Sequence, residues 1–164
     1  MSPPSPLVIE FRFTLPIAVL VVDDQPAVRE GLSRLIACTP LVLRAIGSAA
    51  TSAEALLAAA WLRPAVVVLD ADLAGEDGLA LIPALMPAAV LVLSSHGDRA
   101  TRERALRLGA RAFIEKHQPA AELLAALVHL ATAQMRGEKA PCAAGTSSPA
   151  AAVASSGATG RRSA

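Results

Sequence analysis

Five reactive side chains in this 164-residue sequence share one kind of position, because each stands at or close behind the end of an apolar run: Asp23, Asp24, Asp70, Ser94 and Lys116. Three carboxylates brought close together raise one another's pKa and cost stability unless a cation lies among them. An oxygen-rich cleft of this kind is what Mg²⁺ prefers. A carboxylate nucleophile beside a divalent cation, a lysine and a hydroxyl would form a phosphoryl-transfer site, where catalysis is mostly positioning and charge neutralisation.

Alternating strands and helices are expected to position these side chains. Apolar runs typical of strands buried on both faces lie at 17–22, 41–46, 65–69, 90–93 and 112–114. Helical patterns follow them at 26–39, 51–62, a short stretch ending near 86, 99–108 and 119–135. This order predicts a three-layer α/β fold with a five-stranded parallel sheet. Because ligands of such sheets bind beyond the carboxyl ends of the strands, the five side chains should converge.

Local signals mark several element ends. The sequence Thr51-Ser-Ala-Glu54 is typical of a capping box that opens a helix, and Gly109 suits a helix C-cap. The stretch after Asp70, with Gly75 and Gly78, predicts a loop. Cys38 lies in an apolar stretch and is predicted to be a small buried side chain.

Composition excludes several classes of protein. A net charge of +1 gives no electrostatic case for nucleic-acid binding. No segment reaches the roughly 18 apolar residues of a membrane span. The two cysteines form neither a disulfide framework nor a metal motif, which favours a reducing, cytoplasmic compartment. We expect an N-terminal extension over 1–15, either disordered or an edge strand, one domain over 16–135, and a disordered low-complexity tail over 136–164.

Four motifs in order resemble the receiver domain of two-component response regulators, which has a flavodoxin-like (βα)5 fold. They are Ile17-Ala-Val-Leu-Val-Val-Asp-Asp-Gln-Pro26, Val66-Val-Val-Leu-Asp-Ala-Asp-Leu-Ala-Gly-Glu-Asp-Gly78, Val90-Leu-Val-Leu-Ser-Ser95 and Leu108-Gly-Ala-Arg-Ala-Phe-Ile-Glu-Lys116. Many receivers have proline after the lysine, and His117 here is more similar to receivers fused to a LuxR-type helix-turn-helix. Many also have proline where Ala74 stands. No helix-turn-helix pattern follows Lys116.

The resemblance implies how the acidic residues act. Asp70 would be the phospho-acceptor, receiving a phosphoryl group from a histidine kinase or phosphotransfer protein. Asp23 and Asp24 would be the acidic pair that holds Mg²⁺ together with Asp70. The backbone carbonyl of Asp72 would complete the protein ligands of the metal.

The resemblance also implies a switch. Ser94 and Lys116 would hold the phosphoryl group, and Phe113 would be the aromatic residue that turns inward when the serine moves. His96 is either a solvated loop residue or an influence on the lifetime of the phosphoryl group. The four arginines of the predicted helix 99–108 are either a solvated face or a docking surface for a partner: Arg99, Arg102, Arg104 and Arg107.

The expected output is therefore contact with a downstream protein, with a homodimer as one result of phosphorylation, and no enzymatic activity beyond the domain's own phosphoryl transfer. Two alternatives stay open. Asp70-Ala-Asp72 also resembles the Asp-x-Asp of haloacid-dehalogenase phosphatases, although that motif usually opens its chain. A phosphorylation-independent interaction module is the second alternative. A transcription factor that has lost its DNA-binding part is a third possible history.

Overall fold

The computed structural model describes residues 16–39 and 43–137. Its centre is a five-stranded parallel sheet with the strand order β2-β1-β3-β6-β7. The strands are β1 (Ile17–Val22), β2 (Leu43–Ala49), β3 (Val66–Asp70), β6 (Ala89–Ser94) and β7 (Ala112–Glu115). The predicted α/β fold with five parallel strands is confirmed.

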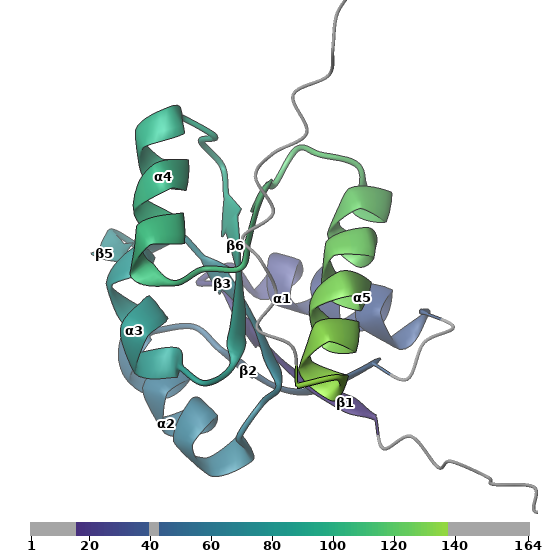
Figure 1. Ribbon diagram of the computed structural model, residues 1–164. Coiled ribbons are helices and arrows are strands. Elements are labelled where there is room, and N and C mark those ends of the chain that lie inside the picture. The colour runs from purple at the N-terminus through teal and green to yellow at the C-terminus, as the bar shows by residue number, and fades with distance from the viewer. Residues whose placement is uncertain (1–15, 40–42, 138–164) are drawn as a thin grey trace, which may run out of the picture.

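Helices cover both faces of the sheet (Figure 1). On one face lie α1 (Pro26–Ala37) and α5 (Ala120–Met135). On the other lie α2 (Ser52–Leu62), α3 (Ile82–Leu85) and α4 (Arg99–Leu108). A 3-10 turn over Gly78–Leu81 leads directly into α3. No helix among the described residues is long and apolar enough to cross a bilayer.

The central strand β3 shows no polar alternation in its sequence because both of its faces are buried. Val66 and Val68 pack into the core under α1 and α5, whereas Val67 and Leu69 pack into the core under α2, α3 and α4. All four side chains are fully buried, because successive residues of a strand point to opposite faces and both faces are covered.

Capping works as the sequence predicts. The Thr51 hydroxyl accepts a hydrogen bond from the backbone N–H of Glu54 at 3.2 Å. The Glu54 carboxylate in turn accepts one from the N–H of Ala50 at 2.8 Å, one residue before the expected position. Gly109 ends α4 with φ at 110°, a conformation that glycine adopts without steric cost.

Two local predictions were wrong. The second strand runs to Ala49 rather than residue 46, because a register shift in its pairing with β1 lets Gly47 and Ser48 continue the ladder. A half-buried edge strand with such residues carries little apolar signal. Cys38 is exposed rather than buried, since it caps the end of α1 after the face formed by Leu32 and Ile36 has turned away.

The loop after Asp70 is more ordered than predicted. β4 (Asp72–Leu73) and β5 (Glu76–Asp77) form a small antiparallel hairpin. Its two turn residues, Ala74 and Gly75, both have positive φ, at 55° and 90°, as in a type I′ turn. Proline, whose φ is held near −65°, could not adopt the conformation of Ala74. The predictions for residues 1–15 and 138–164 lie outside the described residues.

Candidate functional site

Two neighbouring strands bring the three predicted acidic residues together. Asp70 is the last residue of β3, and Asp23 and Asp24 directly follow β1, which pairs with β3. One carboxylate oxygen from each lies within 4.8 Å of the others. Asp23 and Asp70 are buried, and Asp24 is partly exposed. The sheet thus holds three negative charges at one point of its carboxyl edge.

Lys116 directly follows β7 and reaches two of these carboxylates. Its Nζ lies 2.6 Å from Asp70 Oδ2 and 2.8 Å from Asp23 Oδ2. Burial alone would lower the pKa of Lys116, but the contacts with both carboxylates outweigh burial and raise it. The lysine is therefore charged at neutral pH.

Asp70 is in a different electrostatic position. Burial raises the pKa of its carboxyl above the ordinary value, and the charge of Asp23 adds to this rise. The hydrogen bond from Lys116 and the backbone N–H of Asp72, 3.2 Å from Oδ1, oppose it in part. The raised pKa of Asp70 and the raised pKa of Lys116 are compatible, because one ammonium group serves several carboxylates.

The donor set fits a divalent cation. Asp23 Oδ2 is fully buried, and the close polar contact that it makes among the described residues is with the Lys116 ammonium at 2.8 Å. A single lysine neutralises one of three carboxylate charges. Hard, negatively charged oxygens with a remaining negative charge are what Mg²⁺ binds.

A small hollow of about 160 Å³ opens beside the acidic residues. Asp70, Ser94 and Lys116 line it together with residues of the loops after β1, β3 and β6: Asp24, Gln25, Asp72, Ala74, Ser95 and His96. Ser94, the last residue of β6, donates its hydroxyl to the carbonyl of His96 at 2.7 Å and accepts from the N–H of His96 at 3.1 Å. Its hydroxyl is therefore held by its own loop and not by Asp70.

Phe113 lies inward. Its side chain is buried in the core under α4, and the Arg102 guanidinium lies 4.8 Å from the ring centroid. The same guanidinium lies 3.6 Å from Glu115 Oε1. A cation over an aromatic face attracts it, so Arg102 holds the ring and the end of β7 together.

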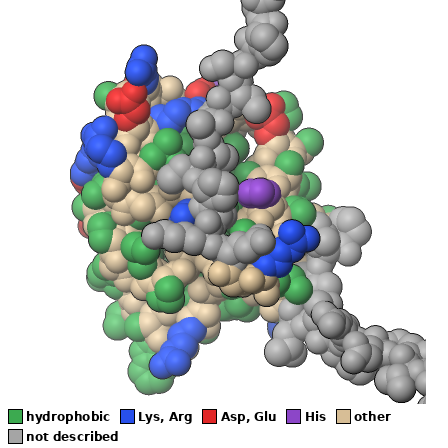
Figure 2. Space-filling model, in the orientation of Figure 1, with side chains coloured by type: hydrophobic (Ala, Val, Ile, Leu, Met, Phe, Trp, Pro, Cys, Tyr) green, Lys and Arg blue, Asp and Glu red, His purple; other side chains and the backbone are tan. Residues whose placement is uncertain are grey.

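The arginines of α4 are not simply a solvated face. Figure 2 shows basic side chains beside acidic ones over this helix. Arg99 pairs with Glu103 at 2.6 Å, and Arg104 makes a two-pronged contact with Asp77 of the β4–β5 hairpin, at 3.0 and 2.5 Å. The Arg104 guanidinium holds the pKa of Asp77 below its ordinary value. The prediction described their exposure and missed their pairing.

Two residues that support the site were missed from the sequence. Arg29 on the first turn of α1 donates to the backbone carbonyls of Asp23 at 2.7 Å and Asp24 at 2.9 Å. Gly78 lies so close to the β3 end that a Cβ atom there would come 2.1 Å from the Asp70 carbonyl oxygen. A basic residue shortly after an acidic pair is a weak sequence signal for the first contact. Gly78 was predicted only as a loop residue, and its close approach to Asp70 was not predicted.

Known proteins share this architecture. The family model for the response regulator receiver domain matches residues 19–128. A protein-glutamate methylesterase/protein-glutamine glutaminase of Moorella thermoacetica is 40% identical over 109 residues, covering 63% of this chain and 26% of that protein. The receiver domain of the response regulator NarL from Mycobacterium tuberculosis has a TM-score of 0.67 and 30% identity, covering 72% of this chain and 98% of that one.

A third relative is the response regulator domain of Thermotoga maritima CheB, with a TM-score of 0.65 and 29% identity, which covers 71% of this chain and 96% of that one. The chain spans about a quarter of the first methylesterase, so the enzymatic activity in that name is a property of the longer protein. The phosphatase alternative receives no support. The chain therefore belongs to the receiver domain family of two-component response regulators, the signalling modules of phosphorelays.

Proposed function

We propose that Asp70 accepts a phosphoryl group from a histidine kinase or phosphotransfer protein, in a Mg²⁺-dependent reaction, within a domain that covers residues 16–135. The observation that carries this proposal is the position of Asp70. Its carboxylate ends the central strand, lines the hollow, and lies close to both the acidic pair and the Lys116 ammonium.

In the proposed transfer, a carboxylate oxygen of Asp70 forms a bond to phosphorus while the bond from phosphorus to the donor's imidazole nitrogen breaks. Asp23, Asp24 and Asp70, with the backbone carbonyl of Asp72, are the ligands that would hold Mg²⁺. When bound, the ion neutralises charge on the phosphoryl oxygens. Lys116, already 2.6 Å from Asp70 Oδ2, is placed to donate to a phosphoryl oxygen.

The switch proceeds through the loop after β6. The hydroxyl of Ser94 leaves the His96 carbonyl and donates to the phosphoryl group. This changes the packing beside Phe113 and Arg102, and the surface of α4 and β7 shifts between two populations. A downstream protein that binds one population better reads the signal, and a phosphorylation-dependent homodimer is one form such a reader can take.

Incubation with acetyl phosphate and Mg²⁺ is expected to add the mass of one phosphoryl group to the wild-type protein in intact-protein mass spectrometry. Asp70→Asn removes the nucleophile and should show no gain. Asp77→Asn is the matched control, because Asp77 lies outside the hollow and pairs with Arg104 instead. A phosphoryl gain that survives in Asp70→Asn, or is absent from the wild type, would refute the proposal.

Mg²⁺ is expected to stabilise the folded protein, because it binds a site that exists only in the native state. At about 100 times its dissociation constant the gain is about 2.7 kcal/mol in free energy of unfolding. Asp23→Asn, which neutralises this buried carboxylate, should lose most of that gain, whereas Asp98→Asn on the exposed α4 cap should keep it. Thermal melts across a Mg²⁺ series measure the difference, and equal gains in both variants would exclude Asp23 as a ligand.

A further inference from the structure

Helix α2 exposes an apolar surface that the proposed function does not use. The helix is apolar all round, yet Ala55 is its only fully buried residue. Leu57 is 62% exposed and Trp61, one turn later on the same face, is 85% exposed. A helix without a polar face is normally buried, so this surface has the composition of an interface.

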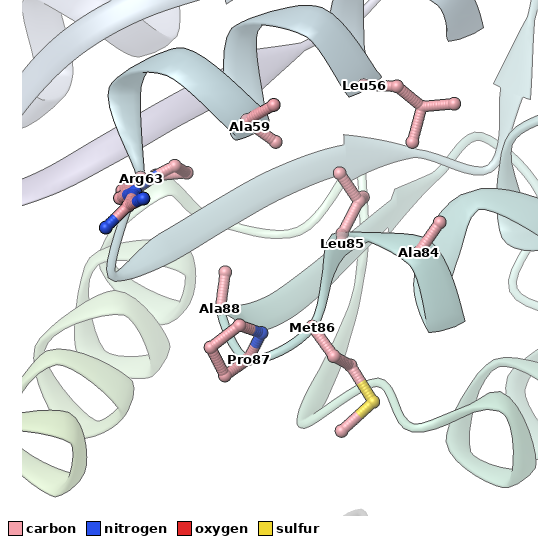
Figure 3. Close-up of a pocket in the computed structure, with 10 residues that line it drawn as sticks. Leu56, Ala59, Arg63, Ala84, Leu85, Met86, Pro87 and Ala88 are labelled. Carbon is pink, nitrogen blue, oxygen red and sulfur yellow. The ribbon is translucent and has the colours of Figure 1, made fainter.

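The apolar surface continues from α2 into a hollow of about 410 Å³ at the end of α3. Figure 3 shows Leu56 and Ala59 of α2 on one side of this hollow and Met86 and Pro87 on the other. Met86 is itself 53% exposed. In Figure 2 hydrophobic side chains spread over the surface formed by α2 and α3. The apolar patch, which includes the exposed side chains of Leu57, Trp61 and Met86, is therefore wider than one helix.

The charges at the two ends of α2 indicate what covers this patch. Between residues 51 and 63 the only charged side chains are Glu54 in the first turn and Arg63 at the C-cap. Among the residues that the structure describes, the Arg63 guanidinium has no ion-pair partner. A second α2 packed antiparallel would bring Glu54 of each copy level with the partner's Arg63.

We propose that two copies of this chain pair through α2 in an antiparallel, two-fold symmetric contact. Leu57 of each copy packs against the partner's Trp61, and Glu54 pairs with the partner's Arg63 at both ends. A two-fold contact repeats every interaction, so one apolar pair and one ion pair per copy suffice to define it. This contact lies on α2, which α3 separates from α4 on the same face of the sheet (Figure 1), and does not depend on phosphorylation of Asp70.

Trp61 is the only tryptophan, so its fluorescence reports directly on the contact. In the unphosphorylated full chain, sedimentation equilibrium should show the mass doubling as concentration rises, with a parallel blue shift of Trp61 emission. Trp61→Ser should raise the dissociation constant about 30-fold or more, as for an aromatic hot spot. Met135→Ser, which removes an exposed apolar side chain of α5, is the matched control and should leave it unchanged.

Charge reversal tests the antiparallel arrangement. Glu54→Arg and Arg63→Glu should each raise the dissociation constant about tenfold, because each variant loses two exposed ion pairs. The double variant should restore the wild-type value, although Glu54→Arg also loses a helix cap and lowers the melting temperature. Restoration by the double variant is a result that a merely structural effect would not produce.

Three outcomes would overturn the proposal. A monomeric mass at every concentration with exposed Trp61 emission shows that copies do not pair. A blue-shifted emission at monomeric mass shows that another part of the chain covers the patch. A dimer that survives Trp61→Ser shows pairing through a different surface.

Discussion

Lys116→Met will lower the free energy of unfolding of the metal-free protein by about 3 kcal/mol, the lower end of the cost of leaving a buried charge unpaired. Among the described residues, the variant removes the only ammonium group within 3 Å of Asp23 and Asp70, whose side chains are 1% and 5% exposed. With Mg²⁺ present the loss should shrink, because the ion supplies positive charge to the same oxygens. Urea unfolding in a chelator and in excess Mg²⁺ measures both values.

Lys116→Arg is the control for this prediction, since it keeps the positive charge and should keep most of the stability in chelator. An equal loss for Lys116→Met with and without Mg²⁺ would contradict the electrostatic explanation and point to lost packing of the lysine stem. Lys116→Met should also be phosphorylated poorly, because it lacks the ammonium group that we expect to donate to the phosphoryl oxygen.

The convergence of the site could be predicted from the sequence because it follows from topology. Asp23, Asp70 and Ser94 each stand at the carboxyl end of a buried parallel strand, and neighbouring strands of such a sheet end at one edge. For these three strands the apolar runs locate the end to within one residue, which is enough to place a carboxylate. The capping box of α2 was also readable, since it depends only on residues three apart.

The rest depends on pairs that periodicity does not connect. Arg104 and Asp77 are 27 residues apart, and Arg102 reaches Phe113 across 11. Both contacts require α4 to lie beside the β4–β5 hairpin and β7, and no local pattern encodes that packing. The hairpin itself was missed because its turn uses Ala74 with positive φ, where sequence rules expect glycine or asparagine.

Gly78→Ala tests how far the backbone around Asp70 tolerates change. The added Cβ would lie 2.1 Å from the Asp70 carbonyl oxygen and 3.1 Å from Ala71 backbone atoms. Backbone cannot rotate away as a side chain can, so the chain after β3 has to shift. We expect a loss of about 3 kcal/mol in free energy of unfolding, the upper part of the range for overpacking, and slower phosphorylation of Asp70.

Gly31→Ala is the matched control for that substitution. Gly31 lies exposed within α1 with no atom near its potential Cβ, so alanine there should add about 1 kcal/mol through helix propensity. Urea unfolding of both variants should therefore give changes of opposite sign. Because Gly78 lines no part of the hollow, slow phosphorylation of a well-folded Gly78→Ala protein would show that the backbone, and not only the side chains, sets the position of Asp70. Wild-type stability in Gly78→Ala would contradict the close approach of this loop to β3.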